Sequence, residues 1–250
     1  MVPAWLHVLA IVSLVLAGVC ALVIAADEVR HPQKMWVMNV VWPVNALYFG
    51  PLGLWAYFAL GRKSTKQHME QMQQEQKGDK PEDKPKEEPQ DPIQKAEQKG
   101  MKPFWQIVAV GVTHCGAGCT LGDIVAEWVV FWTGWLIAGI ALWPEYILDF
   151  TLAYLFGIVF QFFAIAPMRN LGVKDGLVAA VKADTLSLTA FEVGLFGWMA
   201  LTYFVFFSHP HLHPTEATYW FMMQLSMILG FFTSYPVNVW LIKRGIKEAM

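Results

Sequence analysis

Apolar and polar positions alternate along this chain in long blocks. Six apolar runs follow one another, at residues 4–26, 35–61, 104–143, 146–168, 181–207 and 217–242. A helix needs about 20 mostly apolar residues to cross a bilayer. The pattern therefore predicts an all-α fold, a polytopic transmembrane helical bundle, and it matches no soluble fold.

The run at 104–143 is too long for one crossing, because forty helical residues measure roughly 60 Å, twice the hydrocarbon core. In one arrangement, residues 104–112 lie along the inner face and the span begins at His114, which gives six spans. In the other, the Gly-rich sequence HCGAGC is the tip of a hairpin, which gives seven spans and an external linker. We favour six, a four-span core behind an N-terminal pair, because the hairpin would put the basic linker flanks outside. Prolines and glycines within 35–61 predict a kinked helix there.

Residues 62–102 differ sharply from the rest of the chain. They hold ten of the 18 Lys and Arg residues, nine of the 20 Asp and Glu residues, four prolines and almost no large apolar side chain. Such a segment cannot bury a core, and we expect a flexible cytoplasmic linker. It divides the chain into an N-terminal pair of helices, residues 1–61, and a membrane core, residues 103–250.

Composition narrows the function classes further. The chain is 56% hydrophobic and only 15% charged, whereas a soluble domain carries about 25% charged residues. These values exclude an ordinary globular enzyme and a nucleic-acid binder, and they make the lipid bilayer the expected partner. Cys20, Cys115 and Cys119 all lie in apolar segments, so a disulfide framework is not expected.

The orientation follows from the basic residues. The tail KRGIK at 243–247 is expected in the cytoplasm, by the positive-inside rule. With six spans both termini are then cytoplasmic. The histidines of the segment SHPHLHPTE, at residues 208–216, fall in an external loop.

The motif His114-Cys115-Gly-Ala-Gly-Cys119 carries the clearest chemistry. On a helix Cys115, Cys119, Asp123 and Glu127 recur every four residues along one slowly drifting face. Thiolate and imidazole groups are ligands for Cu(I) or Zn(II). The spacing alone fits equally well with cysteines that serve as small apolar residues and a histidine that bonds only a carbonyl.

Carboxyl groups within predicted spans favour a functional interpretation. An Asp or Glu at a helix centre costs about 3 kcal/mol on insertion scales. The four such residues should therefore face the bundle interior and be paired, protonated or bound to a cation: Asp123, Glu127, Asp184 and Glu192. The simpler alternatives are an ion pair of Asp184 with Lys182 or Arg169, and a protonated Glu192 bonded to a neighbouring helix.

Three sequence segments resemble the signatures of the DUF4396 family of bacterial membrane proteins. They are HCGAGCTLGD at 114–123, KADTLSLTAFE at 182–192 and YPVNVWLIKRGIK at 235–247. The resemblance implies a four-span core and marks the motif positions as a functional set. Its name assigns no activity.

The leading hypothesis is a metal-handling protein of the bacterial inner membrane that binds or transports a soft cation, with copper(I) preferred and zinc second. The predicted metal-site residues are His114, Cys115, Cys119, Asp123, Asp184 and Glu192. The first three would bind the metal ion, and the carboxyl groups would neutralise it or relay protons. A membrane redox protein that uses Cys115 and Cys119, and a structural accessory subunit of a larger membrane complex or homo-oligomer, stay open.

Overall fold

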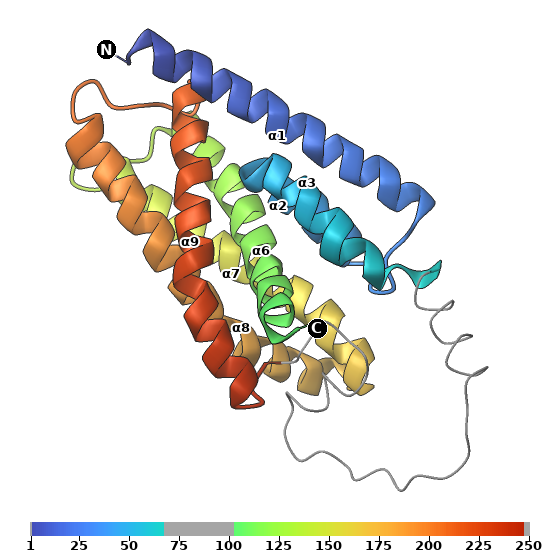
Figure 1. Cartoon of the computed structure of the whole chain (residues 1–250). Helices are drawn as coiled ribbons and strands as arrows, with labels where there is room; N and C mark the ends of the chain where they lie inside the picture. The colour runs from blue at the N-terminus through green and yellow to red at the C-terminus, as the bar shows by residue number, and fades with distance from the viewer. Residues whose placement is uncertain (1, 68–102, 248–250) are drawn as a thin grey trace, which may run out of the picture.

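The computed structural model describes residues 2–67 and 103–247, apart from the side chains of residues 167–169. Its α-helices are α1 (Ala4–Arg30), α2 (Met38–Phe49), α3 (Pro51–Ala56), α6 (Phe104–Thr133), α7 (Leu142–Arg169), α8 (Val173–Leu201) and α9 (Ala217–Lys243) (Figure 1). Short irregular helical turns follow α3 at Tyr57–Gly61 and Arg62–Ser64, and α8 at Thr202–Phe206. The predicted all-α fold is confirmed. Most of the predicted linker, residues 68–102, lies outside the described residues.

Five of the described helices are long and apolar enough to cross a membrane: α1, α6, α7, α8 and α9. Large apolar side chains on their outer faces are exposed, among them Leu22, Val193 and Phe232. In water such surfaces would drive aggregation, whereas in lipid they are the expected exterior. The length, hydropathy and exposed apolar faces of these helices indicate a membrane protein.

The long apolar run beginning at Phe104 forms one uninterrupted helix, α6, so the hairpin at HCGAGC is wrong. Gly134 ends α6 in the left-handed conformation, with φ +63°. Residues 134–141 then form the loop to α7. The apolar run was longer than one span because it continues through this loop.

Helix α6 lies in the interior of the bundle and packs against α7, α8, α9 and α2 (Figure 1). Its approach to α7 is very close, because Gly118 and Gly122 face Gly157 and Ala153. A Cβ atom added to Gly118 would lie 2.9 Å from the backbone nitrogen of Gly157. Small residues at this spacing let two membrane helices touch backbone to backbone, and the contact brings the acidic residues of α6 next to those of α7.

The segment 35–61, expected to be a kinked span, is instead a re-entrant helical hairpin. Gly50 turns the chain, with φ +55° and Pro51 after it, between α2 and α3. The two arms return to one place, where the backbone nitrogen of Lys34 donates to Ser64 O at 3.1 Å and that of Lys66 donates to Pro32 O at 3.1 Å. The chain therefore has five candidate crossings among its described residues, one fewer than the six predicted. An apolar run of this length fits a full crossing as well as a buried hairpin.

The tip of the hairpin is docked deep in the bundle. The Asn45 amide donates to the carbonyl of Thr113 at 2.9 Å, and the Gln224 amide of α9 donates to the carbonyl of Leu47 at 2.6 Å. The end of a helix leaves carbonyls without intrahelical partners. Within a membrane such backbone is tolerated only where protein covers it. The Gln224 amide covers the Leu47 carbonyl in this way, whereas the Asn45 amide holds the hairpin against α6.

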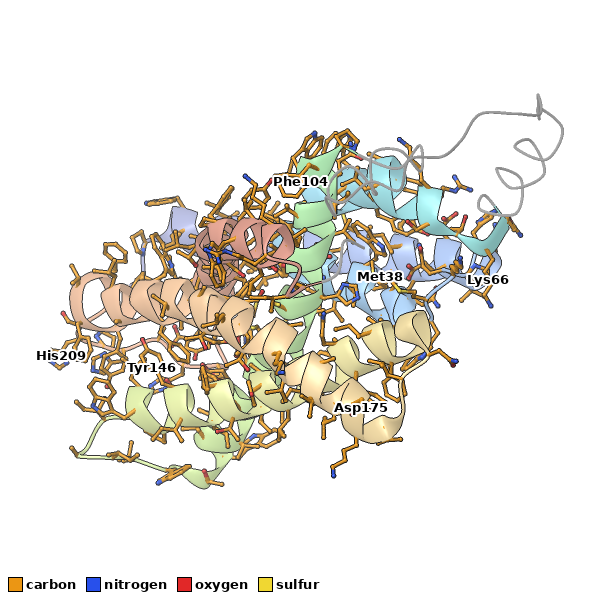
Figure 2. All side chains as sticks on the ribbon, turned by 90° about the horizontal axis from the view of Figure 1, so that it is seen from below. Met38, Lys66, Phe104, Tyr146, Asp175 and His209 are labelled. Carbon is orange, nitrogen blue, oxygen red and sulfur yellow. The ribbon has the colours of Figure 1, made fainter. Side chains whose placement is uncertain are left out.

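The described ends of the chain lie at opposite ends of the bundle. Val2 and Pro3 line a cavity together with His209 and His211 of the loop before α9, whereas Lys247 contacts Gly111 near the start of α6. Figure 2 likewise shows His209 and Tyr146 at one end and Lys66 at the other. With five candidate crossings the described ends lie at opposite ends of the bundle, which does not fit the prediction of two cytoplasmic termini. The cause is the hairpin, which does not cross.

Candidate functional site

A compact set of buried polar side chains, which we call the inner polar cluster, joins three helices and the C-terminal turn. Its members are Cys115 of α6, Asp184 and Ser187 of α8, Asn238 of α9, and Lys247. The Cys115 thiol donates to Asp184 Oδ1 at 2.7 Å, and Ser187 Oγ lies 2.8 Å from the same sulfur. None of the five residues is more than 2% exposed.

Glycine 157 makes room for this cluster. A side chain at that position of α7 would collide with the Asp184 carboxyl group and would come within 2.9 Å of Leu188. The Asp184 side chain therefore lies against bare backbone of α7 while it reaches Cys115 of α6. Helices α6, α7 and α8 can come together at this depth because α7 has a glycine, and so no side chain, at position 157.

Lys247 supplies the positive charge of the cluster. Its Nζ donates to Gly111 O at 3.1 Å, to Cys115 Sγ at 3.3 Å and to Ser187 Oγ at 3.3 Å, and it lies 3.9 Å from Asp184 Oδ1. Burying an ammonium is costly unless it is paired and fully hydrogen-bonded. Here all three of its donors have an acceptor.

Asn238 and Ser234 of α9 complete the hydrogen bonds around Ser187. The Asn238 amide donates to Ser187 Oγ at 2.7 Å and to Ser234 O at 2.9 Å, and Ser234 Oγ donates to Ser187 O at 2.8 Å. These bonds fix the hydroxyl that faces the Cys115 sulfur. The cluster is thus held by a network and not by one ion pair.

His114 is buried beside this cluster but is not bonded to it. Its Nδ1 lies 3.4 Å from the carbonyl of Val110, one turn earlier in α6. In the described part of the chain its Nε2 has no hydrogen-bond partner. One ring nitrogen of His114 is therefore free to accept a proton or a metal ion.

Further along α6 lies a second group of acidic side chains, which we call the outer carboxyl chain. Its members are Asp123 and Glu127 of α6, Glu145 and Asp149 of α7, and Glu192 of α8. The charges of Asp149 interact with those of all the others, and Cys119 lies beside Asp123 and Glu192. The side chains of Asp123, Glu127, Asp149 and Glu192 are at most 2% exposed.

The carboxyl oxygens of this chain are largely without partners. Within residues 2–67 and 103–247, neither oxygen of Asp123 has a hydrogen-bond partner, and the Glu192 carboxyl group has only a loose contact with the Cys119 thiol. One oxygen each of Glu127 and Asp149 likewise lacks a partner among the described residues. Ionised carboxylates packed together in an apolar interior repel each other and lose their hydration. These groups therefore need protons or a bound cation.

The outer carboxyl chain leads to a cavity at the end of the bundle where α1 begins. The cavity has a volume of about 340 Å³ and is lined in part by Glu145, Tyr219, His211 and His213. Tyr219 also lies beside Glu127, the next carboxyl group inward. The acidic side chains thus extend from this opening toward Cys119.

The predicted metal-site residues are separated into three places. Cys115 and Asp184 belong to the inner polar cluster, Cys119, Asp123 and Glu192 lie in or beside the outer carboxyl chain, and His114 is bonded to neither. Both thiols are free. In the described ranges no three His, Cys, Asp or Glu side chains are already arranged to hold one metal ion.

Sequence reasoning missed Lys247, Glu145 and Asp149 as participants. Lys247 was expected only as part of the cytoplasmic basic tail, yet it lies 3.9 Å from Asp184, for which an ion pair with Lys182 or Arg169 was one of the alternatives. Asp149 is a carboxyl group inside the predicted span 146–168. Its unusual position was visible in the sequence and was a signal of function.

A family model described as a domain of unknown function, DUF4396, matches residues 104–247. The match covers α6 to α9 and ends on Lys247, so it includes both polar groups of the bundle. No curated protein and no solved structure matches the chain.

Proposed function

We propose a function from the site itself, because the chain belongs to the DUF4396 family, whose description assigns none. The proposal is an integral membrane protein that binds a soft cation in the bundle interior and moves it between the two polar groups. Copper(I) is the first candidate and zinc the second. Cys115, Cys119 and His114 supply the soft ligands, and the carboxyl groups balance the charge or carry protons.

One observation carries this proposal: among the described residues the Asp123 carboxyl group has no hydrogen-bond partner, and it lies with the Glu192 carboxyl group beside the Cys119 thiol. A structural role would give buried carboxyl groups hydrogen-bond donors, since an unsatisfied buried polar group costs about 1–3 kcal/mol or more. Where such donors are missing, a bound cation can compensate the buried carboxyl groups. In its absence, protons on the carboxyl groups do the same. The adjacent thiol favours a soft ion over a hydrated alkali ion.

The arrangement of the inner polar cluster and the outer carboxyl chain favours transfer of the cation through the bundle, as opposed to its storage at one site. The outer carboxyl chain starts at the cavity lined by Glu145 and continues inward to Cys119. One helical turn further along α6 is Cys115, in the inner polar cluster. Thiols one turn apart, with carboxyl groups around them, offer successive weak sites, which suits transfer better than one tight site.

Charge distribution supports an orientation in the bacterial inner membrane. The loops at 134–141 and 207–216, at the end where α1 begins, contain no Lys or Arg. The basic residues before α8 and after α9 lie at the other end. By the positive-inside rule, Lys247 faces the cytoplasm, and the cavity beside Glu145 faces the opposite side.

The proposal is tested by counting bound metal on the purified full chain after anaerobic loading with copper(I). The wild-type chain should retain copper through gel filtration, and the double variant Cys115→Ser/Cys119→Ser should lose it. Cys20→Ser is the matched control, because Cys20 is equally buried but lies in α1, away from both polar groups. Equal copper on the wild type and the double variant, or none on either, contradicts the proposal. A Cys115–Cys119 disulfide that forms on oxidation would favour redox chemistry instead.

A further inference from the structure

We infer that Lys247 is a tethered cation that occupies the inner cation position, so that a metal ion can bind Cys115 and Asp184 only by displacing it. The inference rests on the proposed function, and it adds the residue that competes with the substrate. It also gives a reason why these two ligands are not arranged around a metal ion in this conformation.

The contacts of Lys247 are those of a bound cation. Its ammonium touches a carbonyl, a thiol and a hydroxyl at 3.1–3.3 Å, with the Asp184 carboxylate at 3.9 Å. A metal ion bound to Cys115 and Asp184 would use the same sulfur and the same carboxylate. Two positive charges cannot share that space, since their repulsion in a low-dielectric interior is large.

The burial of Lys247 is specific to this residue. Its neighbours Lys243 and Arg244 are exposed, although they belong to the same basic tail. Gly245 adopts φ +66°, and the backbone nitrogens of Ile246 and Lys247 donate to Leu241 O at 3.0 and 3.3 Å. This helix-ending turn folds the tail back and directs one of its three basic side chains into the bundle.

The turn after α9 can open and release the Lys247 side chain without disturbing the helix bundle. Lys247 lies only four residues beyond the end of α9, and the turn is held by a few backbone hydrogen bonds to the last helical residues. Local opening of a short turn beyond a helix end costs far less than global unfolding. The vacated position keeps the thiol, the carboxylate and the Asn238-bound hydroxyl in place.

Displacement also makes the site selective. An incoming ion must replace three hydrogen bonds and an ion pair of the ammonium. A sodium or potassium ion gains little from sulfur, whereas a copper(I) ion displaces the Cys115 thiol proton, which is released to water, and gains a strong thiolate bond. Lys247 therefore excludes hard monovalent cations from the inner position.

The first test uses the unaltered full chain in detergent and silver(I), a redox-inert soft cation. An amine-acylating reagent is applied with and without silver(I), and modification is located by mass spectrometry. Lys247 should react roughly tenfold faster when silver(I) is bound, while the exposed Lys243 reacts at one rate. Equal reactivity of Lys247 in the silver-loaded and silver-free chain overturns the inference.

The second test compares silver(I) affinity by chelator competition for the wild type, Lys247→Met and the control Lys243→Met. Removing the competing charge should tighten binding roughly tenfold in Lys247→Met only. Unchanged or weaker binding by Lys247→Met, with normal binding by the wild type, overturns the inference and leaves the proposed function intact. No silver(I) on the wild type overturns both. If Lys247→Met does not fold, the labelling experiment decides.

Discussion

The contact between α6 and α7 at Gly122 can be tested with a single methyl group. In Gly122→Ala the added Cβ would lie 2.7 Å from Ala153 Cα and 2.9 Å from the carbonyl carbon of Leu152. These are backbone atoms, so no side chain can rotate away. Since carbon atoms pack at about 3.5 Å or more, the two helices must separate by roughly 0.8 Å at this point.

Overpacking of this kind typically costs about 1–3 kcal/mol. The separation would also move Asp123 away from Asp149 of the facing helix, so Gly122→Ala should weaken copper(I) binding as well. Gly197→Ala in α8 is the matched control, because nothing lies within 4 Å of an added Cβ there. Its stability should stay within about 0.5 kcal/mol of the wild type.

The assay is reversible unfolding of the purified chain in mixed micelles, followed by circular dichroism. Gly122→Ala should unfold at a clearly lower denaturant fraction than the wild type and Gly197→Ala. If Gly122→Ala is as stable as Gly197→Ala, the backbone contact between α6 and α7 does not exist as described. The position of the outer carboxyl chain would then have no structural basis.

Three further predictions concern the site, the hairpin and the topology. Asp123→Asn/Glu192→Gln should fold with unchanged or higher stability, because it removes two costly buried acids, but should bind less copper(I); full copper binding would contradict their role. Asn45→Ala should destabilise the chain by about 0.5–1.5 kcal/mol, measured by the same unfolding assay, because the hairpin loses its hydrogen bond to the Thr113 carbonyl of α6; an unaltered unfolding midpoint would argue against the docked hairpin. Single cysteines at the exposed Lys34 and Lys66, in a chain with the native cysteines replaced by serine, should react with an impermeant thiol reagent from the same face of the membrane, because the hairpin between them returns to one place; labelling from opposite faces would restore the six-span topology.

The sequence predicted the helices of the membrane core closely. Apolar runs at 146–168, 181–207 and 217–242 correspond to α7, α8 and α9, because helix boundaries in a membrane follow from charge and proline placement. The four-residue spacing of Cys115 and Cys119 also placed them on one face of α6. These features are local, so the linear pattern determines them.

The hairpin could not be predicted from apolar length alone. A run of 27 residues from Met35 to Gly61 has the hydropathy of a span, and only Gly50-Pro51 and the polar Asn45 indicated otherwise. Whether such a segment crosses or returns depends on partners for its open backbone groups. Those partners, among them Gln224, are far away in the sequence.

The sequence could equally not predict that the polar residues divide into two separate groups. Lys243, Arg244 and Lys247 form one basic tail with no local feature that marks the buried member. Only the turn at Gly245 and the space beside Gly111 decide it. Similarly, Asp184 and Glu192 lie about two turns apart on α8 and reach different cysteines, because α6 offers one cysteine at each depth.

The central claim is that a soft cation binds to sulfur in the bundle interior. X-ray absorption at the copper edge measures this directly on the copper(I)-loaded full chain. The account predicts sulfur neighbours around copper in the wild type and in Cys20→Ser, and their loss in Cys115→Ser/Cys119→Ser. A copper environment made only of nitrogen and oxygen, or one that is the same in all three proteins, would contradict it.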